Sequence, residues 1–299
     1  MKEIIYYIKS YYKETDRTIL LLISLFTAFL VFCNYYFGLD TFIRKKNLFV
    51  VKLFCWYVVF AAAFIVPYLF YGFARKKNHL KNKNFYILLV VTPLIFAWKI
   101  SVSLVISFSE NQTNNHFWNQ VGYWPALAIV IFLLLYFIWK LYHEDQPLYG
   151  LRTGNMAWKP YLLMLLIMFP LITLAATQND FLSVYPKLNS VSSEAIWWQK
   201  LLFELSYGSD FFTIEFFFRG FLVLGFAKWV GKDAILPMDC FYCTIHFGKP
   251  LGECISSYFG GLLLGIVVYN TRSIWGGLIV HLGIAWMMEM TGFIGNQLK

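Results

Sequence analysis

Charged residues are scarce in this chain. Asp, Glu, Lys and Arg make up 14% of its 299 residues, whereas soluble domains carry about 25%. Hydrophobic residues reach 59% and aromatic residues 21%. This composition argues against an ordinary soluble protein and favours an integral membrane protein.

Short segments that alternate between apolar and polar residues, which are typical of membrane β-barrels, are also missing. The apolar residues instead form long continuous runs. Because about 20 apolar residues span a bilayer as a helix, we expect an all-α polytopic membrane helical bundle with about eight to nine transmembrane helices.

Nine candidate spans can be placed along the sequence. They cover roughly residues 18–38, 48–73, 85–108, 121–142, 160–177, 199–228, 233–247, 251–270 and 274–293. The seventh is short for a full crossing and could be tilted, broken or re-entrant.

The polar stretch 178–198 is the longest break in the second half of the chain, and it ends in a tryptophan pair that suits a membrane interface. We therefore divide the chain there. We expect a five-span N-terminal bundle over 1–177, an extracytoplasmic linker over 178–198 and a four-helix core over 199–295.

Nucleic-acid-binding motifs are absent although the net charge is +9. The basic residues lie in the N-terminal tail and in short loops, which is the positive-inside pattern of a cytoplasmic membrane protein. The pattern favours a cytoplasmic N-terminus, although the cluster Arg44–Lys46 falls on the opposite side. We expect no nucleic-acid partner.

Metal and redox motifs are also missing. No H-E-x-x-H occurs, and the C-x-x-C formed by Cys240 and Cys243 has no second ligand pair. We interpret the five cysteines as small apolar helix residues and expect no metal and no cofactor.

The few ionisable residues inside apolar runs are therefore informative. Glu215 and Arg219 lie four residues apart in Ile214-Glu215-Phe216-Phe217-Phe218-Arg219-Gly220, so on a helix the two side chains can meet. An ionised side chain costs several kcal/mol at bilayer depth and is usually functional there. The pair is either a packing ion pair or a carboxylate that activates water.

Two histidines, His246 and His281, also lie in apolar runs after the pair, whereas His79, His116 and His143 lie in polar loops. A neutral imidazole can donate a hydrogen bond to an oxyanion or accept a proton. Together with Glu215 and Arg219, the two histidines indicate a catalytic site.

Two further features lie between these histidines. Glu253 follows Pro250, and an acidic residue in the first turn of a helix interacts favourably with the helix dipole. Alternatively, Glu253 could be a second acid of the site. Gly261 and Gly265 form a G-x-x-x-G, which predicts close approach between membrane helices.

These residues resemble the motifs of a known family. Glu215-x-x-x-Arg219-Gly220, His246 within Phe241–Pro250, and Thr271–Trp275 followed by Gly277–His281 are similar, in order and spacing, to the three motifs of the CAAX-protease and bacteriocin-processing (CPBP, or Abi) family of intramembrane glutamic endopeptidases. The resemblance covers about 100 residues.

The chain departs from the family pattern at three positions. Ile214 replaces the first Glu of the first motif, Ala285 replaces an Asn of the third, and Tyr242 replaces a Phe of the second. Three hypotheses follow: Glu215 is the base of a variant protease, Glu253 substitutes for the lost acid, or the protein is an inactive scaffold or complex subunit that binds a peptide, lipid or partner protein.

The resemblance implies hydrolysis of peptide bonds in or near the bilayer. Glu215 would activate water, Arg219 would orient Glu215, and His246 and His281 would polarise the carbonyl. It also implies a multi-pass protein of a bacterial inner membrane. Its partners would be membrane lipid, a peptide or membrane-protein substrate, and in the scaffold hypothesis a partner subunit.

Overall fold

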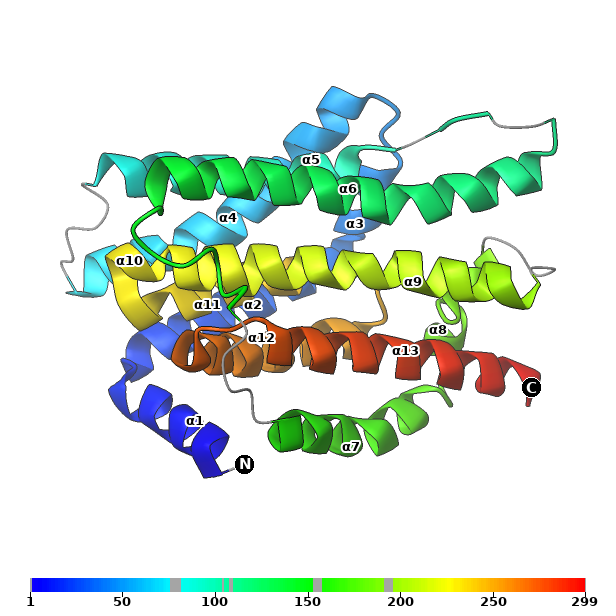
Figure 1. The fold of residues 1–299 in the computed structure, drawn as a ribbon. Helices are drawn as coiled ribbons and strands as arrows, with labels where there is room; N and C mark the ends of the chain where they lie inside the picture. Colours follow the sequence, from blue (N-terminus) through cyan, green and yellow to red (C-terminus); the bar gives the residue numbers. More distant parts are fainter. Residues whose placement is uncertain are drawn as a thin grey trace. The chain divides into compact units, whose positions relative to one another are not determined.

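The structure, a computed structural model, describes residues 2–75, 82–103, 105–107, 110–152, 158–190 and 196–298. Within these residues every regular element is a helix (Figure 1). The predicted all-α polytopic membrane bundle is confirmed. The basic loop residues 76–81, with His79, and residues 191–195 of the predicted linker lie outside the described residues.

The elements follow in the order α1 (Lys2–Glu14), α2 (Arg17–Phe37), α3 (Leu39–Arg44), α4 (Phe49–Arg75), α5 (Lys83–Ser101), α6 (Gln112–Tyr142), α7 (Trp158–Ala175), α8 (Asn179–Leu182), η2 (Lys187–Ser190), α9 (Trp197–Ile214), η3 (Glu215–Gly225), α10 (Ala227–Val230), η4 (Gly231–Ala234), α11 (Ile235–Thr244), α12 (Leu251–Thr271) and α13 (Trp275–Gln297).

Seven of the described helices are long and apolar enough to cross a membrane, namely α2, α4, α5, α6, α7, α12 and α13. They overlap the first five predicted spans and the eighth and ninth, but the third ends at Ser101 rather than 108 and the fourth begins at Asn114 rather than 121. Large apolar side chains cover their outer faces, including Leu25, Phe29 and Phe54. Burying such residues in lipid rather than in the protein is what a membrane bundle requires.

The sixth and seventh predicted spans take other forms. Over 199–228 the chain runs as α9 and then, without a break, as the π-helix η3 (Figure 1). Over 233–247 the main helix is α11, which has ten residues. At 1.5 Å per residue α11 is about 15 Å long, half of a hydrocarbon core, so it does not cross the bilayer by itself.

The helices group into two compact units that do not follow chain order. The first unit contains Met1–Val102, Ile138–Arg152 and Phe217–Ser273, and the second contains Ser103–Phe137, Thr153–Phe216 and Ile274–Lys299. The boundary between Phe216 and Phe217 falls inside η3. The three-part division drawn from the sequence stays a prediction.

Aromatic rings fill the core of the first unit. Phe241 of α11 packs against Phe60 of α4 at 5.0 Å between ring centroids and against Phe218 of η3 at 5.2 Å. Phe96 of α5 lies 5.1 Å from Phe217. Edge and tilted ring contacts at these distances are favourable, so they fix η3 against α11.

The predicted close helix approach is found between α12 and α11. A Cβ on Gly261 would touch the Asp239 carboxylate and lie 2.7 Å from Tyr242, and a Cβ on Gly265 would lie 2.7 Å from Met238. A side chain at Gly261 would therefore displace Asp239 and Tyr242, whereas one at Gly265 would require the Met238 methyl group to move.

In the second unit α13 packs on α7 and α9. Gly276 and Gly283 of α13 meet Tyr161 and Leu165 of α7 so closely that neither has room for a Cβ. The helices α9 and α13 also share an apolar cluster, which includes Phe211 of α9 and Ala285 of α13. This packing places the middle of α13, with His281, beside the end of α9.

Candidate active site

Glu215 and His281 meet inside the second unit. Glu215 is fully buried, and its Oε1 lies 3.0 Å from Nδ1 of His281. The imidazole also packs against Phe211 at 4.8 Å between ring centroids. The sequence places these two residues 66 positions apart, so the fold creates the contact.

Glu215 stands where the helix changes its hydrogen-bonding pattern. It is the residue after α9 and the first residue of the π-helix η3, which continues to Gly225. π-Helical turns are rare and occur often at functional sites, because the wider i→i+5 turn aims side chains differently from an α-helix. The regular spacing that suggested a Glu215–Arg219 pair therefore does not apply directly, and that pairing stays a prediction.

The two positions at which the chain lacks a family polar residue belong to one apolar cluster. Ala285 is a buried member of this cluster, and Ile214 of α9 packs against the cluster. The other buried members of the cluster are Phe117, Leu188, Phe203, Tyr207 and Phe211. The first-motif acid and the third-motif amide are thus replaced by two apolar residues that share the same environment.

The remaining motif residues lie in the first unit. The Arg219 guanidinium is fully buried and stacks 3.9 Å above the centroid of the Tyr242 ring. Tyr242 in turn packs on His246, at 4.8 Å between ring centroids, and Nδ1 of His246 lies 3.1 Å from the Tyr242 carbonyl oxygen. Tyr242 thus links the first-motif Arg to the second-motif His.

The turn that carries His246 is held by α2 in the first unit. Asn34 donates through Nδ2 to the Phe247 carbonyl at 2.9 Å, and the Tyr35 hydroxyl donates to the Lys249 carbonyl at 2.7 Å. These contacts give the first predicted span a role that its sequence did not reveal.

Asp239 is a site candidate that sequence reasoning missed. It was not singled out from the sequence, although it lies inside the predicted span 233–247, and the carboxyl is fully buried on α11. The signal available in the sequence was an acid within the apolar stretch Ile235–Thr244.

Glu253 lies in the first turn of α12, after Pro250, and its Oε1 is 3.1 Å from Nζ of Lys249. This position agrees with a role at the helix start. Its participation as an additional acid stays a prediction.

The C-x-x-C cysteines are buried, but the sulfur nearest to Cys243 is that of Cys254, at 3.9 Å between the two Sγ atoms. Across the described ranges no group of three or more His, Cys, Asp or Glu side chains is arranged to hold a metal ion.

His143 lies in the loop after α6, as expected, but it is fully buried there, with Nδ1 2.7 Å from the Tyr149 hydroxyl and its ring 4.9 Å from that of Trp229. His116 was also expected in a loop, and this is wrong, because it lies inside α6. Burial, helped by the Lys228 charge, lowers the pKa of His143 to about 4. Hydropathy missed this because the segment that buries His143 is itself polar and folds back on η3.

Comparison with known families supports the motif assignment. Residues 193–287 match the family model described as type II CAAX prenyl endopeptidase Rce1-like. This segment is therefore similar to the Rce1-like family. It covers about a third of the chain and includes Glu215, Arg219, His246 and His281. The resemblance to the CPBP family is thereby confirmed at the level of family. No curated protein and no solved structure gave a significant match.

Proposed function

We propose that the protein is an intramembrane endopeptidase of the CPBP type that hydrolyses peptide bonds in or near the bilayer with water activated by Glu215. The contact between the fully buried Glu215 and His281 carries this proposal. A carboxylate hydrogen-bonded to an imidazole inside a membrane protein can hold and move a proton where bulk water cannot.

In the proposed reaction, Glu215 removes a proton from water as the water oxygen attacks the carbonyl carbon. The C–O bond forms, the carbonyl becomes an oxyanion, and the proton passes from Glu215 to the leaving nitrogen when the C–N bond breaks. His281 orients Glu215 through Nδ1 and presents Nε2 to the substrate.

Arg219 and His246 take the roles that the resemblance implies. Arg219 supports the ionised form of Glu215, and His246 donates to the oxyanion, together with His281. A donor of this kind contributes about 10²–10³ in rate. None of these steps requires a metal or a cofactor.

A second function is supported by the apolar cluster that contains Ala285 and receives Ile214. If the missing acid and amide were essential, the protein would be a scaffold that uses the same fold to bind a peptide, a lipid or a partner subunit. The apolar residues Ile214 and Ala285 are compatible with both functions, because the Glu215–His281 contact is present beside them.

We place the protein in the inner membrane of a bacterial cell, with a cytoplasmic N-terminus. Its substrate would be a peptide or a membrane protein reached from the lipid phase. The family description names prenyl substrates. For this chain we propose a membrane-embedded peptide bond without specifying a prenyl group.

The test compares cells that lack the gene with cells complemented by wild type, Glu215→Gln, His246→Ala or His281→Ala. Mass spectrometry of protein termini in the membrane fraction reads out cleavage. We expect a set of termini that appears with wild type and is lost with each variant. If all three variants match wild type in termini and phenotype while the deletion does not, the scaffold function replaces the protease.

A further inference from the structure

The thiols of Cys243 and Cys254 face each other across the turn that carries His246. Their Sγ atoms lie 3.9 Å apart, and both residues are buried. Cys243 lies in the last turn of α11 and Cys254 in the first turn of α12. The two sulfur atoms therefore meet where the turn begins and ends.

Each sulfur also lies close to the main chain of the other cysteine. The Cys243 thiol donates to the Cys254 carbonyl at 3.4 Å, and the Cys254 thiol donates to the Cys243 carbonyl at 3.7 Å. A disulfide has an S–S bond of about 2.05 Å and joins residues whose backbones are near each other. Since the two backbones already are, rotation of the two side chains can bring the sulfur atoms to bonding distance.

Close packing of α11 against α12 fixes this approach. A Cβ on Gly265 would lie 2.7 Å from Met238, and a Cβ on Gly261 would lie 2.7 Å from Tyr242. These contacts join later residues of α11 to earlier residues of α12, as in an antiparallel hairpin. The contact between the two cysteines continues the series at the turn.

The C-x-x-C motif of the sequence would instead pair Cys243 with Cys240. In the structure the Cys240 thiol forms a hydrogen bond with the Thr27 side chain of α2. The partner of Cys243 is thus a residue of the next helix, which the spacing of the cysteines in the sequence does not reveal.

The turn between Cys243 and Cys254 lies at the same end of the first unit as the C-terminus of α2. Asn34 donates to the Phe247 carbonyl, and Tyr35 donates to the Lys249 carbonyl. With the cytoplasmic N-terminus proposed above, α2 ends on the extracytoplasmic side, and the turn lies there too. Disulfides form and persist in the bacterial periplasm, whereas cytosolic thiols are kept reduced.

We propose that Cys243 and Cys254 are a disulfide site and that the folded protein carries this bond. While the hairpin forms, one thiolate attacks the disulfide of a periplasmic thiol–disulfide oxidoreductase, and the second thiolate resolves the mixed disulfide. The two protons and two electrons of the thiols pass to the oxidoreductase, whose disulfide becomes a dithiol. Burial then shields the new bond from reductants.

The loop that the bond closes contains His246, so the bond restrains the turn that presents this imidazole. The choice of compartment rests on the proposed orientation. The pairing of the two sulfur atoms rests on the contacts alone.

Thiol trapping in wild-type protein tests the bond directly. Cells are quenched with acid, free thiols are blocked with N-ethylmaleimide under denaturing conditions, and peptic peptides are analysed by mass spectrometry before and after reduction. We expect a Cys243–Cys254 cross-link in most molecules, with maleimide on Cys33, Cys55 and Cys240. A Cys240–Cys243 cross-link, or maleimide on both Cys243 and Cys254 in most molecules, would overturn the proposal.

Melting curves in detergent give a second readout, with Cys240→Ser as the matched control for Cys254→Ser. A phosphine reductant should lower the melting temperature of wild type and of Cys240→Ser by roughly 5 °C, because the closed loop is lost. It should leave Cys254→Ser unchanged. An equal shift in all three proteins would contradict the bond. Because trapping detects the bond itself, its result stands apart from the orientation scan and from any assay of cleavage.

Discussion

At the scale of single residues, the two departures at Ile214 and Ala285 belong together. Both contribute to one apolar cluster, so reintroducing the family acid alone would put a charge among aromatic and aliphatic side chains. A Glu at position 214 would need a hydrogen-bonding partner in this cluster, and we expect an Asn at position 285 to supply it.

We therefore predict that Ile214→Glu and Ala285→Asn each destabilise the protein, by about 3 kcal/mol and about 1–3 kcal/mol, because each places a polar group in the cluster without a partner. The double variant should be more stable than the sum predicts. Melting curves of the three variants in detergent measure this, and strictly additive losses would show that positions 214 and 285 do not form a polar pair.

His143 gives a pH prediction that is independent of catalysis. Burial lowers its pKa in the folded protein to about 4, whereas the ordinary value is 6.5. Between these values the unfolded chain binds a proton that the folded chain does not, so stability is full above pH 6.5 and falls as the pH decreases toward 4. The loss should reach about 3 kcal/mol.

Melting temperatures between pH 7.5 and 4.5 measure this loss, with His143→Phe as the comparison. The variant should be less stable at pH 7.5, where it lacks the hydrogen bond to Tyr149, but its melting temperature should depend less steeply on pH.

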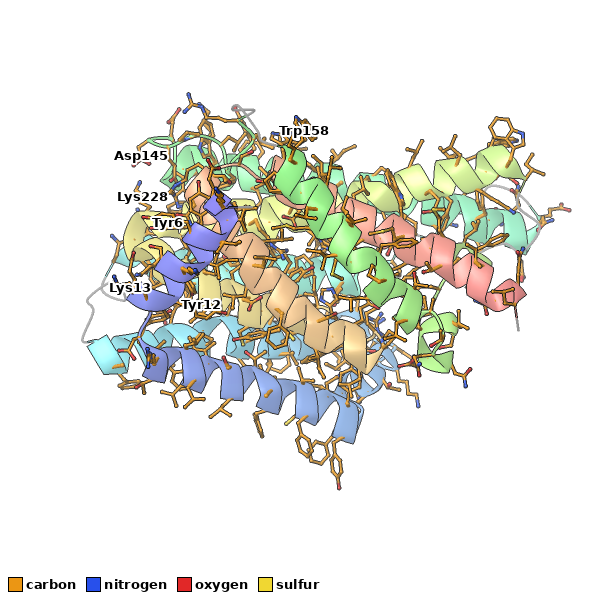
Figure 2. All side chains as sticks on the ribbon, turned by 90° about the horizontal axis from the view of Figure 1, so that it is seen from below. Tyr6, Tyr12, Lys13, Asp145, Trp158 and Lys228 are labelled. Atoms are coloured by element: carbon orange, nitrogen blue, oxygen red, sulfur yellow. The ribbon has the colours of Figure 1, made fainter. Side chains whose placement is uncertain are left out.

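Neighbouring Lys228 and Asp145 form an ion pair at 2.8 Å on the surface (Figure 2). Because Lys228 lowers the His143 pKa, Lys228→Met should raise it slightly and reduce the slope. Equal slopes in wild type and His143→Phe would contradict the assignment.

At the scale of elements, the contact of α12 with α11 is set by glycine. Gly261 faces Asp239 and Tyr242, whereas its neighbour Gly260 has open space around a Cβ. The two residues share a helix and differ only in the face they occupy, which makes them a matched pair.

We predict that Gly261→Ala lowers stability by about 1–3 kcal/mol, because the added methyl group forces α11 and α12 apart. Gly260→Ala should be neutral or stabilising by up to about 1 kcal/mol, since alanine favours the helix. Thermal unfolding compares the two variants. A Gly260→Ala loss as large as that of Gly261→Ala would mean that close packing is not the cause.

Hydropathy predicted the long helices well, because lipid demands about 20 apolar residues whatever the tertiary structure. It did not predict that 199–228 changes from α9 to the π-helix η3 at Glu215, since apolar content does not report an i→i+5 pattern. It did mark the seventh span as short for a full crossing, and α11 has only ten residues. Both irregular elements lie in the segment that matches the Rce1-like family model, and they carry the motif residues Glu215, Arg219 and Tyr242.

The candidate site was predictable in its residues but not in its contacts. Glu215 and His281 stood out as ionisable groups in apolar runs, while their pairing depends on how α13 packs against α9. Asp239 and His143 were missed for opposite reasons. The acid stood alone inside the predicted span 233–247 without a motif partner, and the histidine stood in a polar segment that the fold buries.

At the scale of the whole molecule, the loop charges predict the orientation in the membrane. Single cysteines introduced at Lys81 and Lys187 should react differently with an impermeant thiol reagent added to intact cells. We expect labelling at Lys187→Cys and protection at Lys81→Cys until the cells are opened. Labelling at Lys81→Cys in intact cells would reverse the topology.

The most direct test of the central claim is the cleavage rate of the purified protein in lipid nanodiscs on a peptide that contains the bond mapped in cells. Glu215→Gln keeps the shape of the side chain but cannot accept the proton. The account predicts a loss of about 10²–10⁴ in rate for Glu215→Gln, with an unchanged melting profile and no effect of a metal chelator on the wild type. Cleavage by Glu215→Gln at the wild-type rate would contradict it.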